Sequence, residues 1–249
     1  VVLHTPDHLR EHGRFMVWYR DQLPDHGNCV NVAYSDNGLD WTPHHDNPVY
    51  LKALDAQHVP VWDETRKLWL LYARPQALAA NENRYHQENV RTRISVTVSS
   101  DMKNWEPARH ILAPDELDRG KTSDNPGWFF DRMSTIKYGN QYLGFVAIQP
   151  RRGKDKGWIE LVSSSDGFRW HRSPLREPFI PYGRQGDWDG GHTWMLTSVV
   201  PRGHHLYLYY VGSSKTWRTR FPANTRAIGV ARIRRDRFVG QYGDTGGGW

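Results

Sequence analysis

Only one cysteine, Cys29, occurs in the sequence. A single cysteine cannot form an intrachain disulfide and cannot build a cluster of zinc-binding thiolates. No apolar run approaches the ~18 residues that a transmembrane helix needs, and no signal peptide is visible. We therefore expect no membrane partner. We favour a secreted or periplasmic location over a cytoplasmic one. The chain starts inside an evident strand at Val1, so we expect the natural protein to start upstream.

Several catalytic motifs are also missing. The sequence contains no Gly-x-Ser-x-Gly, no phosphate-cradling glycine loop and no dinucleotide fingerprint. It has no His-x-x-x-His spacing of metal ligands, so we expect neither a metal nor a cofactor. The net charge is +6, but the arginines are dispersed and no nucleic-acid module is recognisable. We expect no nucleic-acid partner, and the sequence does not indicate an oligomeric state.

What the sequence does contain is a large number of aromatic and turn-forming residues. It has 12 Trp and 12 Tyr together with 22 Gly and 15 Pro, although the mean hydropathy is only −0.76. Disordered chains are poor in aromatics, so the low hydropathy indicates long polar loops around packed strands. Apolar residues alternate with a period of two, and no amphipathic helix is evident. The sequence therefore predicts an all-β protein.

Three similar stretches organise the chain, centred on Asp36, Asp101 and Asp166. Both intervals between these aspartates are 65 residues, and an alternating apolar run precedes each of them. A tryptophan follows in every copy (Trp41, Trp105 and Trp170). We expect the aspartate to accept hydrogen bonds from turn amides and the tryptophan to fill the gap between neighbouring units. A period of this length is typical of an array of sheets.

The repeat divides the chain into four similar units. Their approximate bounds are 1–54, 55–127, 128–186 and 187–249, and residues 235–238 form a degenerate fourth turn. We predict one β-propeller domain, 1–249, of four-stranded antiparallel blades, because a propeller closes such units radially and protects their edges.

Acidic residues at the starts of these units are the candidate catalytic groups. First strands line the centre of a propeller, so Asp55, Asp131 and the pair Asp187/Asp189 are expected to meet there. Convergent carboxylates can divide the work of glycoside cleavage between proton donation and nucleophilic or base catalysis. Taken singly, each aspartate is equally well explained as a turn cap or an ion-pair partner.

Aromatic, basic and imidazole side chains accompany these carboxylates. Tryptophan faces can stack on sugar rings, and arginine can bind a carboxylate or phosphate. Glu160, at the start of a third strand, is a weaker acidic candidate. The predicted substrate-binding residues are His58, Arg74, Trp128, Arg132, Glu160, Asp187, Trp188, His192 and Trp194.

The stretches 160–170, 186–191 and 206–212 resemble the five-bladed β-propeller glycoside hydrolases, the superfamily of invertases, levanases and arabinanases (families 32, 43 and 68). The closest similarity is to bacterial proteins of the family 32-like group. This resemblance implies five blades, a carbohydrate substrate, preferably a furanoside such as a fructoside or arabinoside, and three essential carboxylates. We expect the fifth blade to be incomplete or to lie outside these 249 residues.

The sequence departs from the invertase pattern at its motifs. It has no Trp-Met-Asn-Asp-Pro, no Arg-Asp-Pro and no Glu-Cys, so only the inner-strand position transfers, onto Asp55, Asp131 and Asp189. We expect Asp131 to be the stabiliser or base and Asp189 or Asp55 to be the acid.

Three alternatives to a hydrolase remain open. A non-catalytic glycan-binding propeller would use the same carboxylates as hydrogen-bond acceptors. A sialidase-like enzyme would bring Arg20, Arg74 and Arg132 around one cavity. A phosphorylase on the same architecture would require phosphate for turnover.

Overall fold

The computed structural model describes residues 1–25, 27–51, 57–74, 93–122, 125–150, 156–216 and 226–238. Within these ranges the chain is almost entirely β-structure. The two helices described are short 3-10 helices, η1 (Asp7–His12) and η2 (Glu116–Asp118). Neither of these described helices is long or apolar enough to cross a membrane.

Sixteen described strands form four antiparallel sheets in chain order. Sheet 1 contains β1 (Val2–His4), β2 (Phe15–Leu23), β3 (Gly27–Ser35) and β4 (Thr42–Pro43). Sheet 2 contains β5 (Val59–Asp63), β6 (Leu68–Ala73), β7 (Ile94–Ser99) and β8 (Arg109–Leu112). Sheet 3 contains β9 (Arg119–Thr122), β10 (Asn125–Tyr138), β11 (Gln141–Pro150), β12 (Trp158–Ser164) and β13 (His171–Arg172). Sheet 4 contains β14 (His192–Arg202), β15 (His205–Ser213) and β16 (Arg226–Arg234).

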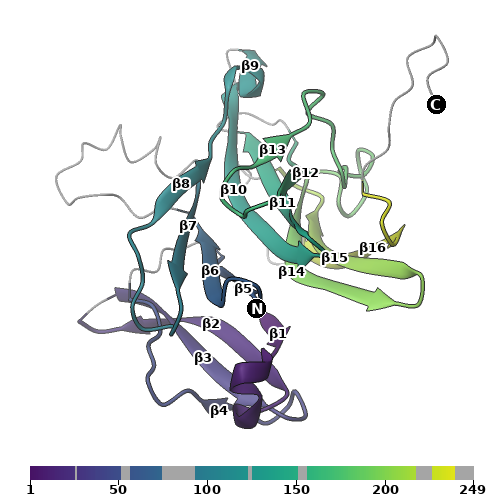
Figure 1. Ribbon diagram of the computed structural model, residues 1–249. Helices are drawn as coiled ribbons and strands as arrows, with labels where there is room; N and C mark the ends of the chain where they lie inside the picture. Colours follow the sequence, from purple (N-terminus) through teal and green to yellow (C-terminus); the bar gives the residue numbers. More distant parts are fainter. Residues whose placement is uncertain are drawn as a thin grey trace.

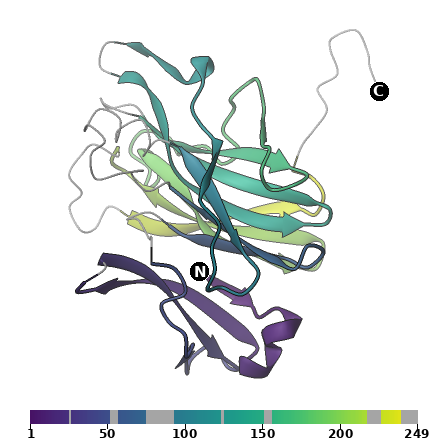
Figure 2. The ribbon, with the colours of Figure 1, turned by 60° about the vertical axis from the view of Figure 1, so that its left-hand side comes forward.

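The four sheets are arranged as the blades of a propeller, with β1, β5, β10 and β14 innermost (Figure 1). The predicted all-β propeller is therefore confirmed. Figure 2 shows that sheet 1 lies below the other three sheets when the molecule is turned. The strand number differs from the prediction in two sheets of the described chain. Sheet 3 gains β9, which pairs with the first residues of β10, and sheet 4 has three strands.

Neighbouring sheets are held together by three hydrophobic clusters of described residues. The cluster between sheets 1 and 2 includes Trp18 and Trp69, whose ring centroids are 5.1 Å apart. The cluster between sheets 2 and 3 is built around Tyr72, Phe130 and other fully buried side chains. The third cluster joins sheets 3 and 4 and includes Phe145. Because side chains alternate along each strand, each sheet can present an apolar face to the neighbouring sheet.

Each of the three repeated turns joins the last two strands of its sheet. In the second copy the hydroxyl of Ser99 accepts a hydrogen bond from the Met102 N–H. The carboxylate of Asp101 accepts hydrogen bonds of 2.8 Å from the N–H groups of both Lys103 and Asn104. The third copy, around Ser164 and Asp166, repeats these contacts. The turn is therefore a fixed structural unit.

The first copy of the turn corrects the predicted register. Asn37, not Asp36, accepts the N–H groups of Leu39 (2.8 Å) and Asp40 (2.9 Å). Asp36 instead accepts a hydrogen bond from the backbone of Arg14. An amide oxygen replaces a carboxylate oxygen here, so counting aspartates placed the first copy one residue too early.

The aromatic residues after the second, third and fourth turns pack on the preceding sheet. Trp105 donates a hydrogen bond of 2.7 Å to the carbonyl of Val49 and packs in the cluster with sheet 1. Trp170 lies edge-on to Tyr72 of sheet 2. In the degenerate fourth turn Phe238 packs against Phe145 of sheet 3. These rings join the sheets, as the sequence predicted.

Candidate functional site

Asp131 lies at a β-bulge in β10, the innermost strand of sheet 3. The register between β10 and β11 shifts at this point, because Phe130 opposes Ile148 and Arg132 opposes Ala147. Asp131 is the extra residue. A bulge of this kind changes the direction of a side chain, and bulges are frequent beside active sites. Here Phe130 faces sheet 2, whereas Arg132 faces sheet 4.

The Asp131 carboxylate is buried, with a relative exposure of 2%, and is paired with two arginines. Nε of Arg132 donates a hydrogen bond of 2.7 Å to its Oδ2. A guanidinium nitrogen of Arg74, just after β6, lies 3.5 Å from its Oδ1. A buried carboxylate requires such partners to offset its lost hydration. Two predicted binding residues thus join a predicted catalytic residue, and they come from two different sheets.

The ring of Trp194, in β14, contacts Arg132 and a second arginine, Arg226. The guanidinium of Arg132 lies 5.6 Å from its ring centroid, and that of Arg226, at the start of β16, lies 5.4 Å from it. His192 stacks on the same ring with a centroid distance of 4.8 Å and an interplanar angle of 17°. These are cation–π and stacking distances. Since these groups surround the ring, we interpret Trp194 as a support for the arginines.

His192 is uncharged at neutral pH. Burial lowers its pKa to about 4, and the nearby guanidiniums of Arg226 and Arg132 act in the same direction, against the carbonyl of Lys215 and the carboxylate of Asp131. Its Nδ1 lies 2.7 Å from the carbonyl oxygen of Lys215. A carbonyl can only accept, so Nδ1 carries the proton and Nε2 is an acceptor.

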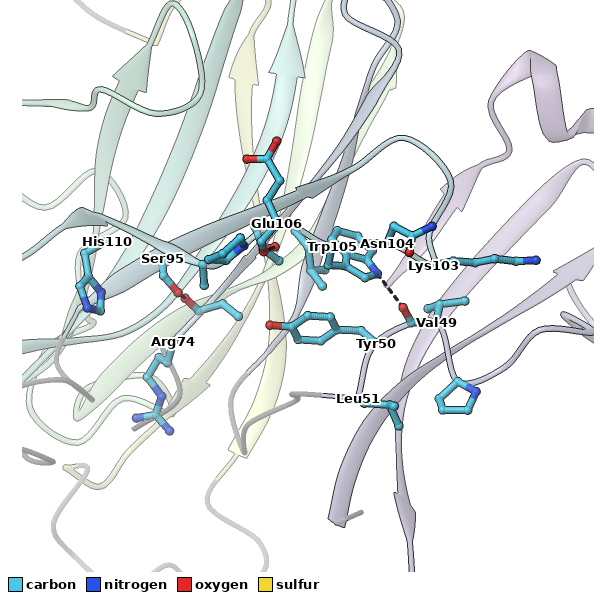
Figure 3. A pocket seen from close by; sticks show the side chains of 16 residues that line it. Val49, Tyr50, Leu51, Arg74, Ser95, Lys103, Asn104, Trp105, Glu106 and His110 are labelled. Carbon is cyan, nitrogen blue, oxygen red and sulfur yellow. Dashed lines mark hydrogen bonds between the residues drawn. The ribbon is translucent and has the colours of Figure 1, made fainter. Parts of the chain in front are cut away.

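A cavity of about 710 Å³ begins beside this group and extends between sheets 1 and 2. Arg74 lines one end of the cavity, and Tyr50 and Trp105 lie further along it (Figure 3). The rings of Tyr50 and Trp105 meet edge to face at 5.5 Å. A cavity of this size with aromatic and polar walls suits a small oligosaccharide. Arg74 is the residue that connects the cavity to Asp131.

A second cavity, of about 290 Å³, lies along the four innermost strands, as expected for the centre of a propeller. Its lining is mainly apolar and includes Val1, Val61 and Ile136. None of the predicted site residues lines it among the residues that the structure describes.

Asp189 lies in the loop before β14, in a different set of contacts. Its Oδ2 accepts a hydrogen bond of 3.0 Å from the hydroxyl of Tyr210, and its side chain packs against Gly183 and Gly212. No contact in the described structure joins it to Asp131. Burial, then this hydrogen bond, raises the pKa of Tyr210 to about 12.

Asp187 and Trp188, in the same loop, lie near Asp189 and not near Asp131 in any described contact. Asp187 is exposed and accepts a hydrogen bond of 2.7 Å from the N–H of Arg184. Trp188 stacks on Tyr210 at 5.7 Å and remains 43% exposed. Its exposed ring is available for a sugar, whereas the Asp187 hydrogen bond stabilises the loop.

Glu160 lies in β12 within a buried ion-pair network. Arg172 donates to both Glu160 oxygens, at 2.7 and 3.0 Å, and to both oxygens of Asp118, at 2.6 and 2.9 Å. The guanidinium also lies 4.7 Å from the ring centroid of Phe130. These contacts join Glu160 and Arg172 of sheet 3 to Asp118 of η2.

The remaining predicted residues divide between the core and the undescribed part of the chain. Trp128 is half-buried and packs against Trp158 at 5.7 Å. His58 is buried at the start of β5, near Tyr50. Asp55 lies outside the described residues.

Two residues near this group were not predicted from the sequence. Arg226 is brought to Trp194 by the pairing of β16 with β15, over a long separation in sequence. Gln149 is fully buried, and neither of its side-chain polar atoms has a hydrogen-bond partner in the described structure. Both residues lie in strands that were predicted from the alternation of apolar residues, and this alternation does not indicate which polar residue of a strand lies near Asp131 and the residues around it. A buried glutamine at the end of β11 is the kind of position where an ordered water or ligand group is expected.

Comparison with known proteins identifies the architecture. No protein-family model matches the sequence, and no curated protein matches it. Among solved structures, the chain is similar to an N-acetylgalactosamine deacetylase from F. plautii in complex with blood group B trisaccharide. The identity is 13% and the TM-score 0.59, over 94% of this chain and 71% of that one.

Mannoside-active enzymes are similar too. A β-1,2-mannobiose phosphorylase from Listeria innocua, in complex with β-1,2-mannobiose, gives 11% identity and a TM-score of 0.56, over 88% of this chain and 54% of that one. The chain is also similar to a structure from the GH130 family of mannoside phosphorylases, which contains glycoside hydrolases that target β-1,2-mannosidic linkages in Candida mannan. Here the identity is 15% and the TM-score 0.52, over 89% of this chain and 62% of that one. The fold is that of glycoside hydrolase and phosphorylase propellers. Identities this low show the fold alone, and the chain spans only part of each of these proteins.

Proposed function

We propose that this protein is a carbohydrate-active enzyme that cleaves a glycosidic bond beside Asp131. The observation that carries the proposal is the buried Asp131 carboxylate at the bulge of β10, which lies beside Arg74, a residue that lines the cavity of about 710 Å³. Three solved structures of the same fold, with TM-scores from 0.52 to 0.59, are described as a deacetylase, a phosphorylase and a member of a mannoside phosphorylase family.

The ion pairs of Asp131 define its role in this reaction. The Asp131 carboxylate has a guanidinium nitrogen beside each of its oxygens, from Arg132 at Oδ2 and from Arg74 at Oδ1. It is suited to act as the base or nucleophile, or to stabilise positive charge that develops on the sugar ring. The general acid is then a different carboxylate, for which Asp55 and Asp189 remain our candidates.

Phosphorolysis is a second candidate reaction, favoured by the arginines. Arg74 and Arg132 contact Asp131, and Arg226 lies with Arg132 on Trp194. Guanidinium groups bind phosphate in a bidentate manner. A phosphate held here would attack the sugar in place of water.

A substrate screen tests the proposal. β-1,2-Mannosides and aryl fructofuranosides and arabinofuranosides would be assayed with and without inorganic phosphate. Asp131→Asn is expected to lower kcat by roughly 10²–10⁴-fold, because the amide keeps the shape but loses the charge. Asp40→Asn, an exposed aspartate of sheet 1, is the matched control and is expected to retain activity.

The outcomes separate the candidates. Release of a sugar phosphate only when phosphate is present identifies a phosphorylase, and release of free sugar without phosphate identifies a hydrolase. Equal turnover by wild type and Asp131→Asn would refute the role of Asp131. Glycan binding without any turnover would instead indicate a binding propeller.

A further inference from the structure

A group of imidazole and carboxylate side chains lies away from Asp131, in the loop that follows β4. His44, His45 and Asp46 are consecutive, and one ligand atom from each lies within 4.8 Å of the other two. The loop is fixed to sheet 1, because the His44 N–H donates a hydrogen bond of 2.8 Å to the carbonyl of Val32. The group was not predicted from the sequence, because its three residues are adjacent and lack the His-x-x-x-His spacing of metal ligands.

The distances within the group suit a tetrahedral ion. Nε2 of His45 lies 3.2 Å from Oδ2 of Asp46. Ligand bonds of ~2.0–2.2 Å in a tetrahedron place two ligand atoms about 3.3 Å apart. A combination of imidazole and carboxylate ligands is typical of Zn²⁺. His12 provides another imidazole nearby, with its ring centroid 6.3 Å from that of His44.

The surroundings of the group contain buried polar atoms without partners in the described structure. Nδ1 of His44 is one of them, and the hydroxyl of Tyr34 is another. The Tyr34 ring lies 5.7 Å from that of His44.

Lys103 of sheet 2 is the group that competes with a cation. Its ammonium pairs with Oδ2 of Asp46 and is 57% exposed, so it can move into solvent. This ion pair joins the sheet 1 loop to the repeated turn of sheet 2. A divalent ion on Asp46 would replace the ammonium at the seam between the two sheets.

We propose that His44, His45 and Asp46 form a binding site for a divalent transition metal ion, with Zn²⁺ as the expected occupant. The site has no described contact with Asp131, so its role is structural. It fixes the loop after β4 at the boundary between sheets 1 and 2.

Calorimetric titration of the chelator-treated protein with Zn²⁺ tests this proposal. We expect one ion per chain and a rise in Tm on binding, since an ion that binds only the folded state stabilises it. His45→Ala removes a side chain that is 72% exposed and should not impair folding. It is expected to weaken Zn²⁺ binding at least ~10-fold, because even the loss of a group that only orients a metal ligand typically lowers metal affinity by this factor.

Two further variants complete the test. Lys103→Gln removes the competing ammonium and is expected to strengthen Zn²⁺ binding several-fold. His204→Ala, an exposed histidine in the β14–β15 turn, is the control and should bind as wild type does. Absence of Zn²⁺ binding, or equal binding by wild type and His45→Ala, would overturn the proposal.

Discussion

At the scale of single residues, the most constrained polar group of the described chain is Arg172. Its side chain and that of Asp118 are each 6% exposed, and that of Glu160 is 1% exposed. Burial alone would raise the pKa of Asp118, but the hydrogen bonds from Arg172 and the Asp115 N–H outweigh it and lower this pKa. Removal of the arginine leaves two buried carboxylates without their main cation.

We predict that Arg172→Met lowers the free energy of unfolding by about 3–5 kcal/mol, the cost of breaking a buried ion pair. Urea denaturation at pH 7 measures this loss. Arg169→Met, an exposed arginine of the neighbouring turn, is the control and should change stability by at most ~0.5 kcal/mol. A loss in Arg172→Met no greater than in the control would show that the network contributes nothing.

The pH dependence of this effect has a definite sign. Because the folded-state pKa of Asp118 is lowered, its contribution is present above the ordinary aspartate value of ~3.9 and is lost as the pH falls below it. The deficit of Arg172→Met should therefore be smaller near pH 3 than at pH 7. A constant deficit across this range would indicate that packing, not charge, causes it.

At the scale of elements, alternation of apolar residues was sufficient to predict the long second and third strands, including β3, β7 and β12. The short outer strands β4 and β13 were not predicted, because they have only two residues each and two residues cannot show an alternating pattern. The bulge in β10 was not predicted either. Strict alternation would place Phe130 and Arg132 on one face, but the inserted Asp131 directs them to opposite neighbours.

The register of the first repeated turn was also predicted incorrectly from the spacing of the aspartates. Asn37 accepts two backbone N–H groups, whereas the one N–H that Asp36 is shown to accept is that of Arg14. We predict that Asn37→Ala destabilises the protein by about 1–2 kcal/mol, as the loss of a capping side chain does. Asp36→Ala, at an exposed position, should cost about 0.5 kcal/mol. Thermal denaturation of both variants decides the register, and a larger loss in Asp36→Ala would restore the aspartate alignment.

At the scale of the whole molecule, the described sheets are stabilised in series. Each of the three hydrophobic clusters joins a sheet to its neighbour in the chain, and sheets 2 and 3 are covered on both faces. Among the described residues, sheet 4 is covered on one face, since Ala231 and Ile233 pack on sheet 3 whereas Ile228 and Val230 are 68% and 54% exposed. This asymmetry could not be predicted, because all four units have similar alternating patterns.

Unequal coverage predicts unequal local stability. In assemblies whose units contact only their neighbours, a terminal unit with one free face opens most easily. Amides of β16 should therefore exchange with solvent faster than those of β11, by on the order of 100-fold in protection. In the described structure β11 is paired on both sides and almost wholly buried, whereas β16 pairs only with β15. Hydrogen exchange followed by mass spectrometry measures both strands in one experiment, with β6 of sheet 2 as the reference for a covered strand. Equal protection of β16 and β11 would mean that the sheets unfold as one cooperative unit in spite of the exposed face.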